Sequence, residues 1–267
     1  MEERPVIFLD SGIGGIPYCQ HFIKRNPAES VFYVADRQNF PYGPRNQGEI
    51  VTILTSLTEK LVETFNPKIA VIACNTASVS ALGNLRAHFQ GISFVGTVPA
   101  VKPASHECRS GKVGVIATER TIADPYVARL LGGDYEICGI AAPDLVDFVE
   151  QRLAVADEKE KRDIVKKYIQ RFRGEGVDCI VLACTHFLFL KEEFQQEAIP
   201  DIKVFDSLDG VTRRIESLLD ENDGALRATS KVSEQNTFFV TGSESADESW
   251  QSWADRLGFR LSAFIAA

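Results

Sequence analysis

The chain has 267 residues, of which 45% are hydrophobic and 25% are charged, so it is long and apolar enough to fold as one large or two ordinary globular domains. A formal net charge of −8 and an isoelectric point near 5.2 argue against nucleic acid or an anionic membrane as a partner. The apolar run at residues 6–9 is too short for a signal peptide, and no stretch approaches the roughly 18 apolar residues of a membrane-spanning helix. We therefore expect a cytoplasmic protein with reduced cysteines.

The first part of the chain alternates short apolar runs with segments of helical periodicity. Such alternation is typical of an α/β protein with a parallel sheet, because buried parallel strands are nearly continuous apolar runs. The predicted strands are 6–9, 31–35, 69–72 and 93–96, and the predicted helices end near residues 24 and 65 or begin after Cys74.

The pattern starts again near residue 112. Strands are predicted at 112–117, 135–140 and 179–182, and helices at 122–131, 144–153, 158–173 and 207–219. A polar loop is expected over 221–234, followed by a strand at 238–242 and a helix that carries Trp250 and Trp253. We expect this tail to pack on the first lobe.

Two cysteines follow strands at equivalent places in the two halves. Cys74 follows Asp10 by 64 residues, and Cys184 follows Thr118 by 66. The similar spacings predict a duplicated α/β unit: two pseudo-symmetric lobes, each a mostly parallel sheet flanked by helices. The expected lobes are residues 1–98 with 207–267, and residues 99–206.

The predicted strand ends carry thiols, hydroxyls and amides, and ligands of open α/β sheets bind at such ends. A free cysteine is usually buried packing, but a repeated cysteine at a strand end favours a functional thiol. A helix that starts after each cysteine would stabilise its thiolate, and His186 is close enough to Cys184 to exchange a proton with it. The candidate residues are Asp10, Ser11, Cys74, Asn75, Thr76, Thr118, Cys184, Thr185 and His186.

No cofactor or metal is expected. The glycine-rich turn at residues 10–15 matches neither G-x-G-x-x-G nor a phosphate-binding loop, and the chain has no C-x-x-C pair. The candidate set also lacks lysine and arginine, so hydroxyls, amides and backbone N–H groups would have to hold a small anionic ligand.

Several motifs together resemble the glutamate racemases of the cofactor-independent aspartate/glutamate racemase family. They are Asp10-Ser11-Gly12-x-Gly14-Gly15, Tyr42-Gly43, Cys74-Asn75-Thr76-Ala77-Ser78, Val98-Pro99-Ala100 and Cys184-Thr185-His186. The resemblance implies two α/β lobes with the active site in the cleft between them and one catalytic cysteine per lobe. It also implies interconversion of L- and D-glutamate for peptidoglycan synthesis.

By the same resemblance, Cys74 and Cys184 are the acid/base pair, and a homodimer is a candidate assembly. Asp10 and His186 are expected to assist them in catalysis. The residues expected to line the substrate site are Asp10, Ser11, Tyr42, Gly43, Asn75, Thr76, Thr118, Thr185 and His186. The chain departs from the family at Ala183, where glycine is common, and at Leu188, where proline is common. The second departure puts the helix start after Cys184 in question.

The chemistry agrees with racemisation, because inverting an α-carbon requires a base on one face and an acid on the other. Other classes stay open at this point. They are a racemase of a related amino acid such as aspartate, a Cys-His hydrolase or transferase, a zinc enzyme with Cys74, Cys184 and His186 as ligands, and a non-catalytic binding protein.

Overall fold

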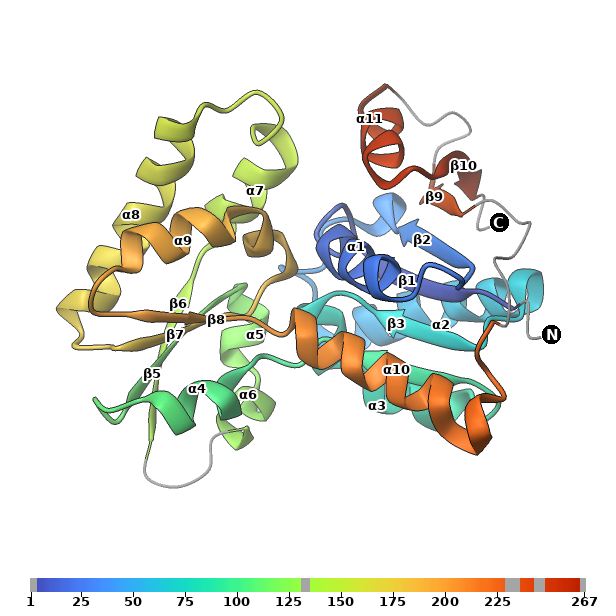
Figure 1. Cartoon of the computed structure of the whole chain (residues 1–267), viewed down its shortest axis with the longest axis horizontal. Coiled ribbons are helices and arrows are strands. Elements are labelled where there is room, and N and C mark those ends of the chain that lie inside the picture. The colour runs from blue at the N-terminus through green and yellow to red at the C-terminus, as the bar shows by residue number, and fades with distance from the viewer. Residues whose placement is uncertain (1–3, 131–134, 229–235, 243–247, 265–267) are drawn as a thin grey trace. The chain divides into compact units, whose positions relative to one another are not determined.

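The computed structural model describes residues 4–130, 135–228, 236–242 and 248–264 (Figure 1). The chain divides into two compact units, Met1–Thr97 with Leu208–Ala267, and Val98–Ser207. Each unit has its own parallel sheet flanked by helices, which confirms the predicted fold class. None of the described helices is long and apolar enough to span a bilayer.

The first unit contains a six-stranded parallel sheet in the order β10-β9-β2-β1-β3-β4. The strands are β1 Val6–Asp10, β2 Val31–Ala35, β3 Ile69–Ile72, β4 Ser93–Gly96, β9 Thr237–Thr241 and β10 Arg260–Phe264. The helices are α1 Ile16–Arg25, η1 Arg37–Asn39 (a 3₁₀ turn), α2 Gln47–Phe65, α3 Asn75–His88, α10 Leu208–Gly224 and α11 Glu248–Leu257.

Both faces of this sheet are covered, which explains why its central strands are apolar throughout. On one face, side chains such as Ile7 and Val34 form a core with the apolar stripes of α2 and α3. On the other face, Phe8 contacts Phe22 of α1, and Phe238 contacts Trp250 of α11. The tail therefore packs on the first unit.

The second unit contains a four-stranded parallel sheet in the order β6-β5-β7-β8. Its strands are β5 Lys112–Ala117, β6 Glu136–Ala141, β7 Cys179–Leu182 and β8 Lys203–Phe205. Its helices are α4 Val101–Glu107, α5 Glu119–Ala123, α6 Pro125–Arg129, α7 Pro143–Gln151, α8 Glu158–Gly174, η2 Thr185–Leu190 and α9 Lys191–Ala198. In chain order, the strands of this sheet pair as second-first-third-fourth, the same order as β2-β1-β3-β4 in the first unit. The two units therefore share a topology, as the duplicated sequence pattern predicts.

The helix predicted over 122–131 is wrong, because the structure has two short helices with a break at Asp124. Asp124 is extended, with φ −78° and ψ 123°. A residue that precedes proline disfavours the helical conformation, and Pro125 follows. The Asp124 carboxylate then accepts a hydrogen bond from the Tyr126 backbone N–H and starts the second helix.

Two further expectations near strand ends are corrected. An α-helix was expected directly after Cys184, but residues Thr185–Leu190 form a 3₁₀ helix and the α-helix begins only at Lys191. Leu188, in place of proline, lies within this 3₁₀ segment. The helix predicted to end near 219 continues to Gly224, so the polar loop begins later than expected, and part of that loop, residues 229–235, lies outside the described residues.

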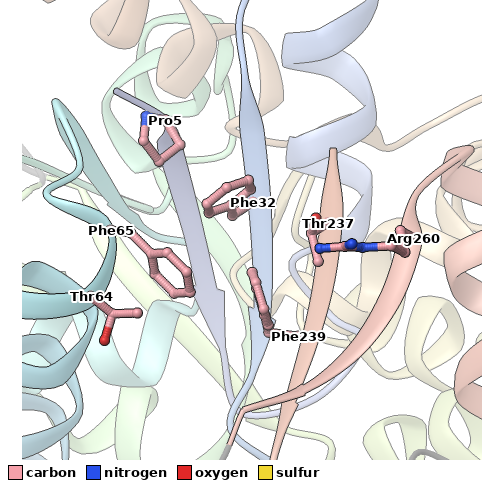
Figure 2. A pocket seen from close by; sticks show the side chains of 7 residues that line it. All are labelled: Pro5, Phe32, Thr64, Phe65, Thr237, Phe239 and Arg260. Carbon is pink, nitrogen blue, oxygen red and sulfur yellow. The ribbon is translucent and has the colours of Figure 1, made fainter. Parts of the chain in front are cut away.

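A cavity of about 490 Å³ lies at the amino ends of the strands of the first unit (Figure 2). Its lining residues are Pro5, Phe32, Thr64, Phe65, Thr237, Phe239 and Arg260. The rings of Phe32, Phe65 and Phe239 contact one another, with centroids 4.9 to 5.5 Å apart. None of the residues predicted to act in catalysis or substrate binding lines this cavity, because those residues lie at the opposite, carboxyl ends of the strands.

Candidate active site

Four neighbouring strands of the first unit end in polar side chains at the same edge of the sheet. In the order β9, β2, β1 and β3, the strand ends carry Thr241, Asp36, Asp10 and Cys74. Parallel strands that are about 4.8 Å apart bring such a series together. Of these four residues, only Asp10 and Cys74 are predicted site residues.

Asp10 is fully buried and organises the turn between β1 and α1. Its Oδ1 accepts hydrogen bonds from the Gly12 backbone N–H at 3.0 Å and from Ser11 Oγ at 3.2 Å. The turn is also held from β2, because the Tyr33 hydroxyl donates to the Gly12 carbonyl at 2.8 Å and accepts from the Gly15 N–H at 3.1 Å. These hydrogen bonds hold Asp10 and Ser11 in one place.

Gly15 is required by close packing of this turn against the neighbouring strand end. A Cβ atom at Gly15 would lie 2.8 Å from the Ala73 Cβ and 2.9 Å from the Ala73 carbonyl oxygen. Ala73 immediately precedes Cys74, so the turn that carries Asp10 lies directly beside the backbone that carries the thiol. This explains the last glycine of the pattern, Gly15, without a bound phosphate.

Tyr42 is tied to the same edge through Asp36. The Tyr42 hydroxyl donates to Asp36 Oδ2 at 2.6 Å, and both side chains are almost completely buried. Burial, followed by the neighbouring charge of Asp36 and the hydrogen bond to it, raises the pKa of Tyr42 well above its usual value, with Cys74 and Asp10 adding to the effect. Tyr42 is therefore a neutral phenol that donates to Asp36. Gly43 follows it in a turn closed by the Arg45 N–H and the Tyr42 carbonyl.

Cys74 precedes the first turn of α3 with extended backbone angles, φ −140° and ψ 122°. Asn75 and Thr76 begin the helix, and all three side chains are buried. Neither the amide oxygen nor the amide nitrogen of Asn75 has a hydrogen-bond partner among the described residues. An unpaired buried polar group costs about 1–3 kcal/mol, so this amide is suited to a polar ligand beside the thiol.

In the second unit, Thr118 and Cys184 follow the adjacent strands β5 and β7. Thr118 caps α5, because its Oγ1 accepts a hydrogen bond from the Thr121 N–H. Cys184 and Thr185 are buried at the start of the 3₁₀ segment. The predicted residues of this unit thus lie at the carboxyl edge of its sheet.

Cys184 belongs to a chain of three ionisable groups. Its Sγ lies 3.8 Å from His186 Nδ1, and His186 Nε2 lies 2.6 Å from Glu150 Oε1 on α7. Burial alone would lower the pKa of His186, but the hydrogen bonds with Cys184 and Glu150, together with their charges, raise it well above the usual value. The raised pKa favours an imidazolium at His186 that donates to both neighbours.

The cysteines outside the predicted site have a different environment. Burial raises the pKa of Cys19 and of Cys138, and raises that of Cys179 to about 12. These thiols are therefore poor acids. Within the described residues, no group of three or more histidine, cysteine or acidic side chains could hold a metal ion.

Comparison with known proteins places the chain among racemases. The model of the Asp/Glu/hydantoin racemase family matches residues 18–215. The chain belongs to this family. It is 38% identical to a glutamate racemase from Sphingopyxis alaskensis over 82% of this chain and 83% of that protein, and 35% identical to one from Treponema pallidum over 99% and 97%.

A solved structure of a family member has the same fold over its whole length. The Escherichia coli glutamate racemase, in complex with L-glutamate and the activator UDP-MurNAc-ala, superposes with a TM-score of 0.85 at 29% identity, covering 98% of each chain. The strand order and the flanking helices described above are therefore those of a racemase of this family.

Proposed function

We propose that this protein is a glutamate racemase that interconverts L- and D-glutamate with two cysteines and without a cofactor. One observation carries the proposal. The two sheets share a strand order, and in each unit a buried cysteine directly follows the third strand, beside side chains that can bind or exchange protons. In a family of amino-acid racemases, this pair fits the two bases that inversion of an α-carbon needs.

In the proposed mechanism, one thiolate removes the proton from Cα and the other thiol returns a proton to the opposite face. Glu150 and His186 hold a positive charge beside Cys184. Asp10 lies on the strand beside that of Cys74 and would assist proton transfer at this thiol as a carboxylate, without the positive charge that His186 supplies at Cys184. Cys74 and Cys184 alternate as base and acid, so each turnover leaves the two thiols exchanged in protonation state.

The remaining predicted residues would bind the substrate. The unpaired amide of Asn75, with Ser11 and Thr76, would receive the polar groups at Cα beside Cys74. Beside Cys184, the polar groups of the substrate would be bound by Thr118, Thr185 and His186. The loop after β2 would contact the substrate through Tyr42 and Gly43. We also propose a cytoplasmic location and a role in supplying D-glutamate for peptidoglycan synthesis.

Circular dichroism tests the proposal directly. Purified protein incubated with L-glutamate should abolish the ellipticity of the amino acid, because the product is a racemic mixture, whereas L-aspartate should keep its signal. Activity should persist in protein treated with EDTA. Racemisation of aspartate instead of glutamate would keep the mechanism but change the substrate, and no loss of ellipticity with either amino acid would reject the function.

A Cys-His hydrolase or transferase is the second candidate, because His186 lies beside Cys184. That chemistry forms a covalent acyl-cysteine, so mass spectrometry of protein quenched during turnover distinguishes the two. The racemase should show the unmodified mass of the chain throughout.

A further inference from the structure

The strand β9, which belongs to the tail of the chain, reaches the proposed substrate site through a buried carboxylate. Thr241 Oγ1 donates to Asp36 Oδ1 at 2.6 Å, and Tyr42 donates to Asp36 Oδ2 at 2.6 Å. Asn39 Nδ2 donates to both oxygens, at 3.1 and 3.0 Å. The Asp36 carboxyl group is therefore held by a different hydroxyl at each oxygen.

Thr241 also fixes the backbone of the loop that leads to Tyr42. Its Oγ1 accepts a hydrogen bond from the Gln38 N–H at 3.1 Å. The next residue, Gly242, has φ 76°, and a Cβ there would lie 2.7 Å from the Gln38 Cβ. The threonine and the glycine thus fit β9 closely against residues 37–39.

We infer that Thr241 is a positioning residue for Tyr42, acting through Asp36. Because the Tyr42 proton is donated to Asp36, the phenol oxygen can only accept a hydrogen bond on its substrate side. That orientation depends on a fixed carboxylate, and Thr241 provides the donor that keeps Asp36 Oδ1 occupied. Without it, Oδ1 keeps the longer hydrogen bond from Asn39 but loses the shorter one, so the carboxylate is held less firmly and the phenol has a less well fixed acceptor. This inference rests on the proposed function, which places Tyr42 at the substrate.

The same strand offers a matched control. Thr237 and Thr241 are four residues apart, so they lie on the same face of β9, and both are buried. Thr237 is at the amino end, beside Arg260 and the cavity with its three phenylalanines (Figure 2). Thr237→Val changes the same residue type in the same strand, but far from Asp36.

Steady-state kinetics in both directions test the inference. Thr241→Val should raise KM about tenfold for both enantiomers, which is the effect of one hydrogen bond to a charged group, while kcat and the primary isotope effect change less than about twofold. Thr241→Ser keeps the hydroxyl and should restore KM to within about twofold of the wild type. Thr237→Val should leave KM unchanged, even where it lowers Tm.

A double-mutant cycle with Tyr42→Phe separates positioning from loss of stability. If Thr241 acts through Tyr42, the KM increase in Thr241→Val/Tyr42→Phe should be smaller than the product of the two single increases. Multiplicative effects, an unchanged KM in Thr241→Val, or an equal rise in Thr237→Val would overturn the inference. Should Thr241→Val not fold, Thr241→Ala is the second variant, with the same expected result.

Failure of the proposed function is visible separately. If the wild-type protein does not racemise glutamate, the function is wrong. If it does, but Tyr42→Phe leaves KM unchanged, the role of Tyr42 is wrong and so is the role inferred for Thr241.

Discussion

The imidazole of His186 lies between a carboxylate and a thiol, and this position governs the pH at which it loses its proton. Its raised pKa means that the imidazolium persists above the usual range near 6.5 and is lost only as pH rises through the folded value. Whatever stability or activity depends on the positive charge is therefore fully present below pH 6.5 and disappears on the alkaline side.

Replacing Glu150 with glutamine removes the carboxylate 2.6 Å from Nε2 and should lower the pKa of His186. We expect the alkaline limb of the kcat/KM profile to move to lower pH, with a loss of about tenfold or more at pH 8. Asp147→Asn, which removes an exposed carboxylate from the same helix, should leave the profile in place. An alkaline limb that stays unchanged in Glu150→Gln would show that His186 does not control it.

The residues next to the strand ends were predicted from the sequence, but the residues that hydrogen-bond to them from other elements were not. Glu150 lies 36 residues from His186 in the chain and belongs to an amphipathic helix, so no local pattern marks it. Asp36 ends the second strand and could have been chosen by the same rule that selected Asp10. Thr241 could not, because only the placement of β9 beside β2 brings it to Asp36.

At the scale of an element, the turn between β1 and α1 depends on a phenol from the neighbouring strand. Tyr33→Phe would leave the Gly12 carbonyl and the Gly15 N–H without their hydroxyl partner in a buried place. The turn that carries Asp10 should then be held less firmly, and we expect kcat to fall about tenfold or more.

The primary isotope effects with the two α-deuterated enantiomers show whether this loss acts through the first unit. Tyr33→Phe should raise the effect more for the same enantiomer that Cys74→Ser affects, because both changes weaken one proton transfer. Tyr168→Phe, which removes a buried phenol hydroxyl bonded to Asp144 in the second unit, is the control. Equal increases for both enantiomers in Tyr33→Phe would contradict a role confined to the side of Cys74.

The elements were predictable where burial alone decides them. The central parallel strands are apolar runs with covered faces, and they were found within a residue or two. β10 was missed because its sequence, Arg260-Leu-Ser-Ala-Phe, is too polar to resemble a buried strand, and its position at the edge of the sheet accounts for that. The break at Asp124 was visible in the following proline but was outweighed by helical periodicity.

In the whole molecule, each unit supplies one thiol of the proposed mechanism, and each thiol therefore serves one face of Cα. In D₂O, the product of opposite hand formed early should carry deuterium at Cα, while recovered substrate carries little, because different thiols remove and deliver the proton. Mass spectrometry of the separated enantiomers measures this. Labelling of substrate and product to the same extent would indicate a single base.

The cysteine variants extend this test to each direction. Enantiomers have equal free energies, so kcat/KM must stay equal in the two directions even in a crippled enzyme. Isotope effects are not bound in this way. The family resemblance implies that Cys74 deprotonates D-glutamate, so Cys74→Ser should raise the effect for the D form more, and Cys184→Ser should do the reverse. Identical changes in both variants would reject one cysteine per face.

The route of the chain through the two units also sets the order in which the site can be completed during synthesis. The second unit is continuous, whereas the first is interrupted after Thr97 and resumes at Leu208. A ribosome therefore completes the second unit before it adds Thr241, whose hydroxyl donates to Asp36 Oδ1. Thr241 follows Asp36 by 205 residues in the chain. A nascent chain therefore acquires both thiols well before the hydrogen-bond network around Asp36 is complete.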